Sequence, residues 1–152
     1  MKLQIGFYKS KNILDKIVSI FRNTKYSHVC LISNNYKIEA IIPIGVRKAD
    51  IRSYGGSWQL DIYNVNIPTK AQVKIWSDAY QKIGKKYDYK GVLHFVFWWY
   101  KQSKYRYFCS ELVAEVFQNA GYPLSHKAPS NCTPEDLVHS EILEYKKTIW
   151  GQ

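Results

Sequence analysis

The sequence predicts one domain that combines β-strands with α-helices. Three observations lead to this expectation: a length of 152 residues, several short segments in which apolar residues alternate, and others in which they recur at helical spacing. Up to Gly84 the predicted elements follow in the order strand, helix, several strands and helix. No internal repeat, low-complexity segment or linker divides the chain, so residues 1–152 are expected to form a single domain.

Strands are expected where apolar and polar residues alternate or where β-branched and aromatic residues gather. Five segments have this pattern: residues 1–8, 26–33, 36–42, 58–67 and 142–150. Asn34–Asn35, between the second and the third of these segments, predicts a tight hairpin turn. The last segment is expected to lie at an edge of the sheet.

Helices are expected where apolar residues recur at intervals of three and four. The predicted helices are residues 13–21, capped near Asn12 and ending near Asn23; residues 69–83, ending at Gly84; residues 109–120, ending at Gly121; and a short helix from Pro134, capped by Thr133. The second helix should bury one face, formed by Val73, Trp76, Tyr80 and Ile83. The pattern assigns no structure to the aromatic stretch at residues 87–107.

The three cysteines indicate a reducing compartment and exclude a disulfide framework. Their number is odd, no C-x-x-C pair occurs, and no set of Cys and His residues has the usual spacing of zinc ligands. We therefore expect neither a structural metal nor a cofactor.

The chain carries a strong positive charge. Lys and Arg outnumber Asp and Glu by 22 to 12, a formal net charge of +10, which should draw the protein toward anionic surfaces such as nucleic acid, cell-wall polymers or acidic lipid. The charges are scattered, without a basic arm or a known nucleic-acid motif. They are expected to govern solubility and encounter more than chemistry.

The N-terminal segment favours synthesis in the cytoplasm. It lacks the long apolar core of a secretion signal, and the longest apolar run, residues 92–100, has about half the length of a membrane span. No transmembrane segment is expected. Action outside the cell would require another route, for which cell lysis or delivery in a virus particle are the obvious choices.

Cys109 is the first candidate for a catalytic residue. It lies where an apolar segment turns into a helix, in the sequence YFCSELV, and the helix should begin at or just after it. The positive end of the helix dipole and free backbone N–H groups favour the thiolate there, which is the nucleophilic form of cysteine. The alternative is a small buried hydrophobic residue, so the assignment depends on a base elsewhere in the chain.

His28 and Glu39 are the candidates for that base and for the acid that orients it. A cysteine nucleophile needs a base, usually histidine, and a third group that fixes the imidazole ring. A tight turn at Asn34–Asn35 would put His28 and Glu39 nearly opposite each other in adjacent strands. Glu39 interrupts an apolar strand, where a buried carboxylate needs a partner. In the alternative, both side chains point into water.

Cys30 and Cys132 lack the features that favour Cys109. Cys30 is two positions from His28 in one strand, about 7 Å away, which is too far for direct proton transfer. It also lacks a helix end that would activate it, so we expect it to be structural. Cys132 lies just before a helix start but has no evident base.

Five segments resemble the circularly permuted, NlpC-type papain-like cysteine hydrolases of the YiiX-like group. They are YSHV at residues 26–29, IEA at 38–40, GKKYD at 84–88, YFCSELV at 107–113 and TPEDL at 133–137. In unpermuted papain-like enzymes the cysteine helix precedes the histidine strands, and here the order is reversed. The combination of CSELV with an upstream SHV is the most specific part of the resemblance.

The resemblance implies an α+β fold, a small antiparallel, barrel-like sheet packed with helices. It also implies that Cys109 attacks a carbonyl carbon, that His28 accepts its proton and later protonates the leaving group, and that Glu39 holds His28 in place. The backbone N–H of Cys109 would stabilise the oxyanion. Tyr87 matches a tyrosine that such enzymes often carry before the nucleophile, which makes it a candidate substrate or oxyanion residue.

The leading hypothesis is a cysteine amidase or peptidase that cleaves a small amide, such as a peptide bond of peptidoglycan, and a bacterial or bacteriophage origin would fit it. A second hypothesis keeps these residues but takes a lipid ester or acyl-lipid as substrate, because related folds include acyltransferases. Trp98, Trp99 and Tyr100, with the positive charge, would suit an anionic membrane. A third hypothesis is a basic binding module without activity, in which aromatic residues stack on bases.

Overall fold

Six antiparallel strands form one sheet, and helices pack on it. The computed structural model describes residues 2–10, 25–41, 44–85 and 107–151. The strands are β1 (Leu3–Ser10), β2 (His28–Ser33), β3 (Tyr36–Ile41), β4 (Gly45–Asp50), β5 (Trp58–Val65) and β6 (Leu143–Gly151). Their order in the sheet is β4-β3-β2-β1-β5-β6, and all neighbours are antiparallel. This is the α+β class that the sequence predicts.

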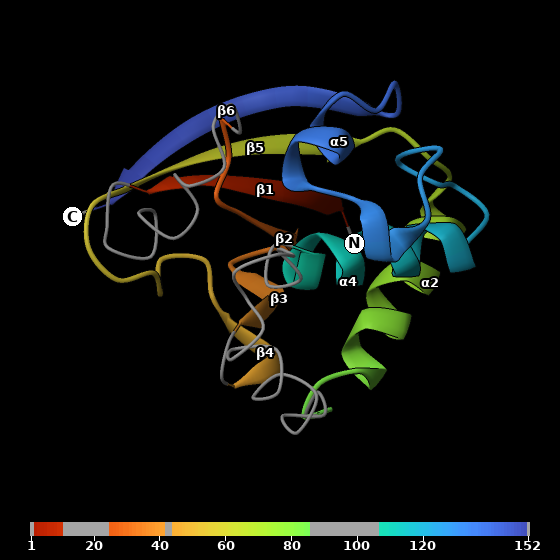
Figure 1. The fold of residues 1–152 in the computed structure, drawn as a ribbon, viewed down its shortest axis with the longest axis horizontal. Helices are drawn as coiled ribbons and strands as arrows, with labels where there is room; N and C mark the ends of the chain where they lie inside the picture. The colour runs from red at the N-terminus through yellow and green to blue at the C-terminus, as the bar shows by residue number, and fades with distance from the viewer. Residues whose placement is uncertain (1, 11–24, 42–43, 86–106, 152) are drawn as a thin grey trace, which may run out of the picture.

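The described helices are α2 (Thr69–Gln81), α4 (Tyr107–Asn119), α5 (Pro134–Val138) and a short 3-10 helix, η2 (Pro129–Asn131). Helix α4 packs against β2 and β3, α2 contacts α4 and β1, and α5 contacts α4 (Figure 1). No helix in the described ranges combines the length and apolar character needed to cross a membrane. The helix predicted at residues 13–21 and most of the aromatic stretch, residues 87–106, lie outside the described residues.

The hairpin predicted at Asn34–Asn35 is confirmed. Ser33 pairs with Tyr36 across the turn, and Asn34 has a φ of 55°, in the left-handed region that asparagine tolerates better than most residues. Continued along the strands, this register puts Glu39 opposite Cys30. His28 is therefore diagonal to Glu39, on the same face of the sheet.

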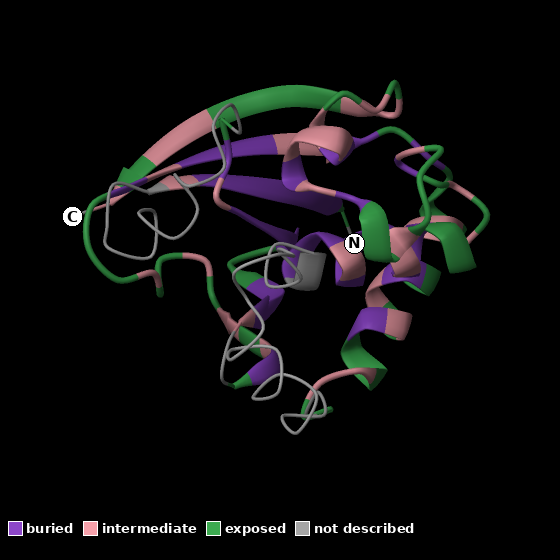
Figure 2. Cartoon of the chain, viewed as in Figure 1, coloured by how far each residue is buried: buried purple, intermediate pink, exposed green. Residues whose placement is uncertain are grey.

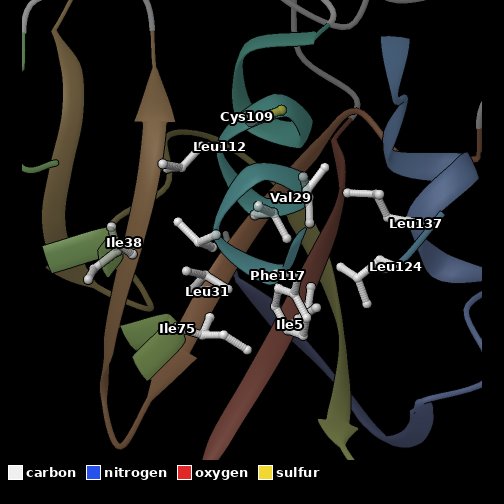
Figure 3. Close-up of a cluster of buried hydrophobic side chains, with 14 of the residues drawn as sticks. Ile5, Val29, Leu31, Ile38, Ile75, Cys109, Leu112, Phe117, Leu124 and Leu137 are labelled. Carbon is white, nitrogen blue, oxygen red and sulfur yellow. The ribbon is translucent and has the colours of Figure 1, made fainter. Parts of the chain in front are cut away.

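The main core lies between the sheet and the helices. Alternate residues of the central strands face the helices, and α4 contributes its apolar face. The fully buried members include Leu3, Ile5, Phe7, Val29, Leu31, Ile38, Leu112, Val113, Val116 and Phe117. Figure 3 shows Leu112 and Phe117 of α4 among the buried side chains of the core, which include Val29 and Leu31 of β2. Burial of each large side chain contributes about 1.5–3 kcal/mol, which holds α4 against the strand that carries His28.

The opposite face of the sheet carries a second, smaller apolar cluster. Its buried members are Tyr8, Cys30, Ile32, Trp58, Leu60 and Ile62. Because side chains alternate along a strand, His28 shares this face with Cys30 and Ile32, and Lys37 shares it with Glu39. His28, Lys37 and Glu39 therefore lie on a mostly apolar face of the sheet.

The buried face of α2 differs from the predicted one. Ile75 and Ala79 are its buried residues, whereas Val73 and Tyr80 are 49% and 53% exposed. The two other predicted residues, Trp76 and Ile83, pack partly against the core. The rotation is fixed by Gln72, whose side chain accepts a hydrogen bond from the backbone N–H of Leu3 and donates to the carbonyls of Val65 and Ile67.

Two predictions for the C-terminal part are confirmed. Strand β6 lies at the edge of the sheet next to β5, and its residues are largely exposed, in contrast to the buried β1 (Figure 2). Helix α5 has the predicted cap: the Thr133 hydroxyl accepts from the backbone N–H of Asp136, and the Asp136 carboxylate accepts from the backbone N–H of Thr133.

Candidate active site

Cys109 lies in the first turn of α4. The helix begins at Tyr107, slightly before the predicted start, so Cys109 is inside the helix and not at its first position. The backbone N–H groups of a first turn have no acceptor within the helix, and the helix dipole is positive at this end. The residue is 7% exposed, and Figure 3 shows its sulfur at the end of α4, above the core residues.

The groups around the Cys109 sulfur stabilise a thiolate. The sulfur hydrogen-bonds with the side chain of His28 and with the backbone N–H groups of Val29 and Ser110. Burial alone would raise the pKa of the thiol. The positive charge of His28 and these hydrogen bonds outweigh burial, so the pKa of Cys109 lies below its ordinary value.

His28 lies between Cys109 and Glu39. Its Nε2 is 2.8 Å from Oε2 of Glu39, which leaves Nδ1 as the ring nitrogen available to the thiol. Burial lowers the pKa of His28, but the negative charges and hydrogen bonds of Cys109 and Glu39 raise it to about 9. The lowered pKa of Cys109 and the raised pKa of His28 both favour an imidazolium paired with a thiolate.

Glu39 is a buried carboxylate with three cationic partners. Its Oε2 lies 2.8 Å from both His28 Nε2 and Lys37 Nζ. Its Oε1 accepts hydrogen bonds from Arg47, at 3.0 Å from Nε and 2.8 Å from Nη2. Burial raises the pKa of Glu39, but the hydrogen bonds and charges of His28 and Lys37 lower it to about 2. Glu39 is thus ionised across the range in which His28 titrates.

Lys37 and Arg47 pair with Glu39, and the sequence motifs do not identify either of them. A signal for Lys37 exists, because it lies two positions before Glu39 and strand alternation places both on one face. Its charge in an apolar strand also calls for a partner. The position of Arg47 depends on the pairing of β3 with β4, in which Glu39 is opposite Arg47. No short turn motif fixes that register in the sequence.

Two tyrosines pack beside His28. The ring centres of Tyr8 and Tyr54 lie 5.7 Å and 5.9 Å from that of His28, and the two tyrosines stack on each other at 4.3 Å. The Tyr8 hydroxyl donates to the carbonyl of Ile51. Burial raises the pKa of Tyr8 above its ordinary value, so its ring beside the imidazole is uncharged.

The other two cysteines are in different surroundings. Cys30 is fully buried in the second cluster, and burial raises the pKa of its thiol. The Cys132 thiol donates weak hydrogen bonds to the carbonyls of Lys127 and Ala128, and burial raises its pKa as well. Tyr87, the candidate substrate or oxyanion residue, lies outside the described residues.

Most of the sequence matches one protein family. The permuted papain-like amidase enzymes, the YaeF/YiiX group of family C92, match residues 7–130. The chain belongs to this family. It is therefore a papain-like hydrolase of the amidase and peptidase type, and the permuted, YiiX-like resemblance that the sequence motifs predict is confirmed. The order of β2 with His28 before α4 with Cys109 follows the permuted arrangement.

The fold of this C92 protein is similar to that of a solved structure over nearly its whole length. The crystal structure of metalloprotein yiiX from Escherichia coli O157:H7 matches with a TM-score of 0.68 and 21% sequence identity, covering 99% of this chain and 98% of that one. At this identity the likeness concerns the fold. No curated protein sequence matches the chain.

Proposed function

We propose that this C92 enzyme is a cysteine amidase in which Cys109 is the nucleophile, His28 the general base and acid, and Glu39 the group that orients His28. The observation that carries the proposal is the line of contacts from Cys109 through His28 to Glu39. His28 and Cys109 belong to different elements, β2 and α4, so nothing local in the sequence accounts for their contact.

In the first step, the Cys109 thiolate attacks the carbonyl carbon of the amide. A C–S bond forms, and the carbonyl electron pair moves to the oxygen, for which the backbone N–H of Cys109 is the proposed donor. When the intermediate collapses, the C–N bond breaks and His28 gives its proton to the leaving nitrogen. The products of this step are a free amine and a thioester on Cys109.

In the second step, water hydrolyses the thioester. Neutral His28 takes a proton from the water molecule as its oxygen attacks the carbonyl carbon. The C–S bond then breaks, the carboxylic acid leaves, and Cys109 is again a thiolate paired with protonated His28. Glu39 remains ionised in both steps and holds the Nε2 side of the ring.

The proposed substrate is a short peptide or small amide, such as a stem peptide of the bacterial cell wall. The amidase chemistry of the family supports the bond type, and the formal charge of +10 favours an encounter with anionic polymers. A lipid ester would use the same three residues. The residues that favour a lipid, Trp98, Trp99 and Tyr100, lie outside the described part of the chain.

The related yiiX structure is named a metalloprotein, which raises metal-dependent chemistry as an alternative. In this chain, the side chains near Cys109 already have partners within the protein. His28 hydrogen-bonds with Cys109 and Glu39, and both carboxylate oxygens of Glu39 pair with cationic side chains. Within the described ranges, no three His, Cys, Asp or Glu side chains gather as a metal site requires. We therefore propose that turnover survives a chelator.

The experiment is a substrate panel analysed by mass spectrometry. Wild type and Cys109→Ala are incubated, with and without EDTA, with muropeptides, short amide peptides and lipid esters. We expect an amine product that requires Cys109 and persists in EDTA. Cys132→Ser is the matched control, because that cysteine is also buried but contacts the carbonyls of Lys127 and Ala128, and it should keep full activity.

The other outcomes separate the remaining hypotheses. Cys109-dependent turnover of lipid esters alone would replace the amidase with a lipid acyl hydrolase. Salt-sensitive binding of nucleic acid that survives Cys109→Ala, without any product, would favour the basic binding module. Activity that EDTA abolishes would contradict the cysteine mechanism without metal.

A further inference from the structure

Lys37 is a fully buried cation on the strand that carries Glu39. It is 0% exposed, and its Nζ donates to the carbonyl of Ser53 at 3.1 Å and to the hydroxyl of Tyr8 at 3.4 Å. The ring centres of Tyr8 and Tyr54 lie 4.9 Å and 5.2 Å away. Removing an ammonium group from water costs free energy, so the buried Lys37 depends on these contacts for its stability.

Lys37 and His28 bind the same carboxylate oxygen. Both Nζ of Lys37 and Nε2 of His28 lie 2.8 Å from Oε2 of Glu39, so the two nitrogen atoms are within twice that distance of each other. Burial keeps water from screening the pair. When His28 takes up a proton, its new charge is therefore close to the ammonium of Lys37.

Arg47 occupies the other oxygen of the same carboxylate. Its guanidinium makes two hydrogen bonds to Oε1 while its side chain remains 33% exposed. The carboxylate of Glu39 is thus paired with the side chains of both Lys37 and Arg47 in addition to His28. A carboxylate in this setting attracts a proton on His28 less strongly than an isolated carboxylate would.

We propose that Lys37 is a positioning residue that fixes Glu39 against His28 and, by its charge, makes the His28 imidazolium a stronger acid. The inference rests on the proposed function, because it assigns the effect to His28 as proton donor. Glu39 alone would hold the proton on the ring. The positive charge beside the shared oxygen weakens that hold, which favours proton transfer to the leaving nitrogen.

Charged and titratable groups face His28 from several elements. Taken in chain order, they are Tyr8 of β1, Cys30 of β2, Lys37 and Glu39 of β3, Arg47 of β4, Tyr54 after β4, and Cys109 of α4. Lys37 and Arg47 are the cations of this set. Lys37 is the one that shares an oxygen with His28, so its removal should have the larger effect.

The test is the titration of the His28 imidazole, followed by NMR in Cys109→Ala protein. The alanine removes the thiolate, which would otherwise couple to the ring. In this background, Lys37→Met should move the His28 midpoint upward by on the order of one pH unit, because a nearby positive charge is lost. Lys37→Arg keeps the charge and should leave the midpoint close to that of the parent.

Lys48→Met is the matched control. Lys48 belongs to the neighbouring strand β4, is exposed, and lies over the ring of Tyr36 at 4.2 Å. The substitution makes the same change in net charge at a solvated position. The His28 midpoint should not move.

An unchanged or lower His28 midpoint in folded Lys37→Met protein would overturn the inference. A lower midpoint would show that Lys37 only holds Glu39 in place. Thermal melting shows whether the variant folds. If Lys37→Met does not fold, the His28 titration is repeated with Arg47→Gln. We expect a smaller upward shift of the His28 midpoint in this variant, and the absence of a shift would contradict the inference.

The titration requires no substrate, so it is independent of the substrate panel. Loss of turnover in Cys109→Ala, together with a midpoint that Lys37→Met leaves in place, would keep the amidase and reject this role of Lys37. In the active enzyme, the alkaline limb of the pH profile should shift upward in Lys37→Met. A merely structural role would lower activity without that shift.

Discussion

At the scale of single residues, the candidate site places three charges where burial alone would disfavour each of them. Cys109, His28 and Glu39 are 7%, 7% and 1% exposed. Each is adjacent to a group of opposite charge, and these contacts reverse the effect of burial on their pKa values. A substitution at one position therefore changes the protonation of the others.

Cys109 should be the cysteine that iodoacetamide modifies fastest near neutral pH. Its pKa is lowered by His28 and backbone N–H groups, whereas burial raises the pKa of both Cys30 and Cys132. Peptide mapping after brief treatment of the folded protein measures the three rates. Faster labelling of Cys30 or Cys132 would show that the nucleophile is misassigned.

Turnover should have a bell-shaped dependence on pH. On the acid side it falls as the Cys109 thiolate is protonated, at a pH below the ordinary range of a thiol because that pKa is lowered. On the alkaline side it falls as His28 loses its proton, near pH 9. Measuring kcat/KM against pH tests both limbs. An alkaline limb near the ordinary pKa of histidine would contradict the imidazolium–thiolate pair.

At the scale of elements, strand β3 unites the acid and its buried counter-ion. Glu39→Gln removes the negative charge but leaves Lys37 buried, so we expect a loss of about 3–5 kcal/mol in the free energy of unfolding in addition to lower turnover. The double variant Lys37→Met/Glu39→Gln should recover part of that stability, because the unpaired cation is gone. Urea unfolding of the two single variants and the double variant measures the coupling.

Additive losses in that cycle would mean that Lys37 and Glu39 do not stabilise each other. Arg47 complicates the comparison little, because it remains in all variants and its side chain reaches water. Lys37 lies two residues before Glu39, so strand alternation predicts that both side chains are on the same face once β3 is known.

Local sequence patterns predict the elements that begin or end at residues with strong turn or capping preferences. The turn at Asn34–Asn35 fixes the β2–β3 register, and Thr133 with Pro134 fixes the start of α5. The buried face of α2 could not be predicted from apolar spacing, because hydrogen bonds of Gln72 to distant backbone groups set its rotation. These contacts form only after the sheet is in place.

At the scale of the whole molecule, the candidate site depends on how α4 docks on the sheet. His28 comes from β2 and Cys109 from α4, and the buried residues of α4 pack on β2 and β3. The sequence motifs predicted both residues and the permuted order. They did not predict that Arg47 would bind Glu39, because that contact follows from a strand pairing without a sequence marker.

Acid should destabilise the whole sheet through two carboxylates. Burial raises the pKa of Asp61, but its hydrogen bonds with Thr148, Gln59, Tyr26 and Lys9 lower it overall, and the pKa of Glu39 is lowered to about 2. Groups with lowered pKa values stabilise the fold fully above their ordinary range and lose this contribution as pH falls through the lowered values.

The urea concentration at the unfolding midpoint should therefore decrease steadily as the pH is lowered below about 4.5, the ordinary pKa of a Glu carboxyl group. Asp61→Asn should be less stable at neutral pH and show a flatter dependence on pH. A midpoint in the wild type that stays constant down to pH about 2 would contradict this account of the buried carboxylates.

In the proposed mechanism, Cys109 is activated by His28 and forms a covalent intermediate with an amide substrate. To detect this intermediate, the wild type is mixed with an amide that it hydrolyses in the substrate panel. The reaction is quenched rapidly with acid, and the protein is analysed by peptide mapping. We predict an acyl group on Cys109, no such adduct in Cys109→Ala, and a rate of adduct formation lowered at least about 1,000-fold in His28→Ala. Turnover of the amide by Cys109→Ala at the wild-type rate, or an adduct on Cys30 or Cys132 in its place, would contradict the account.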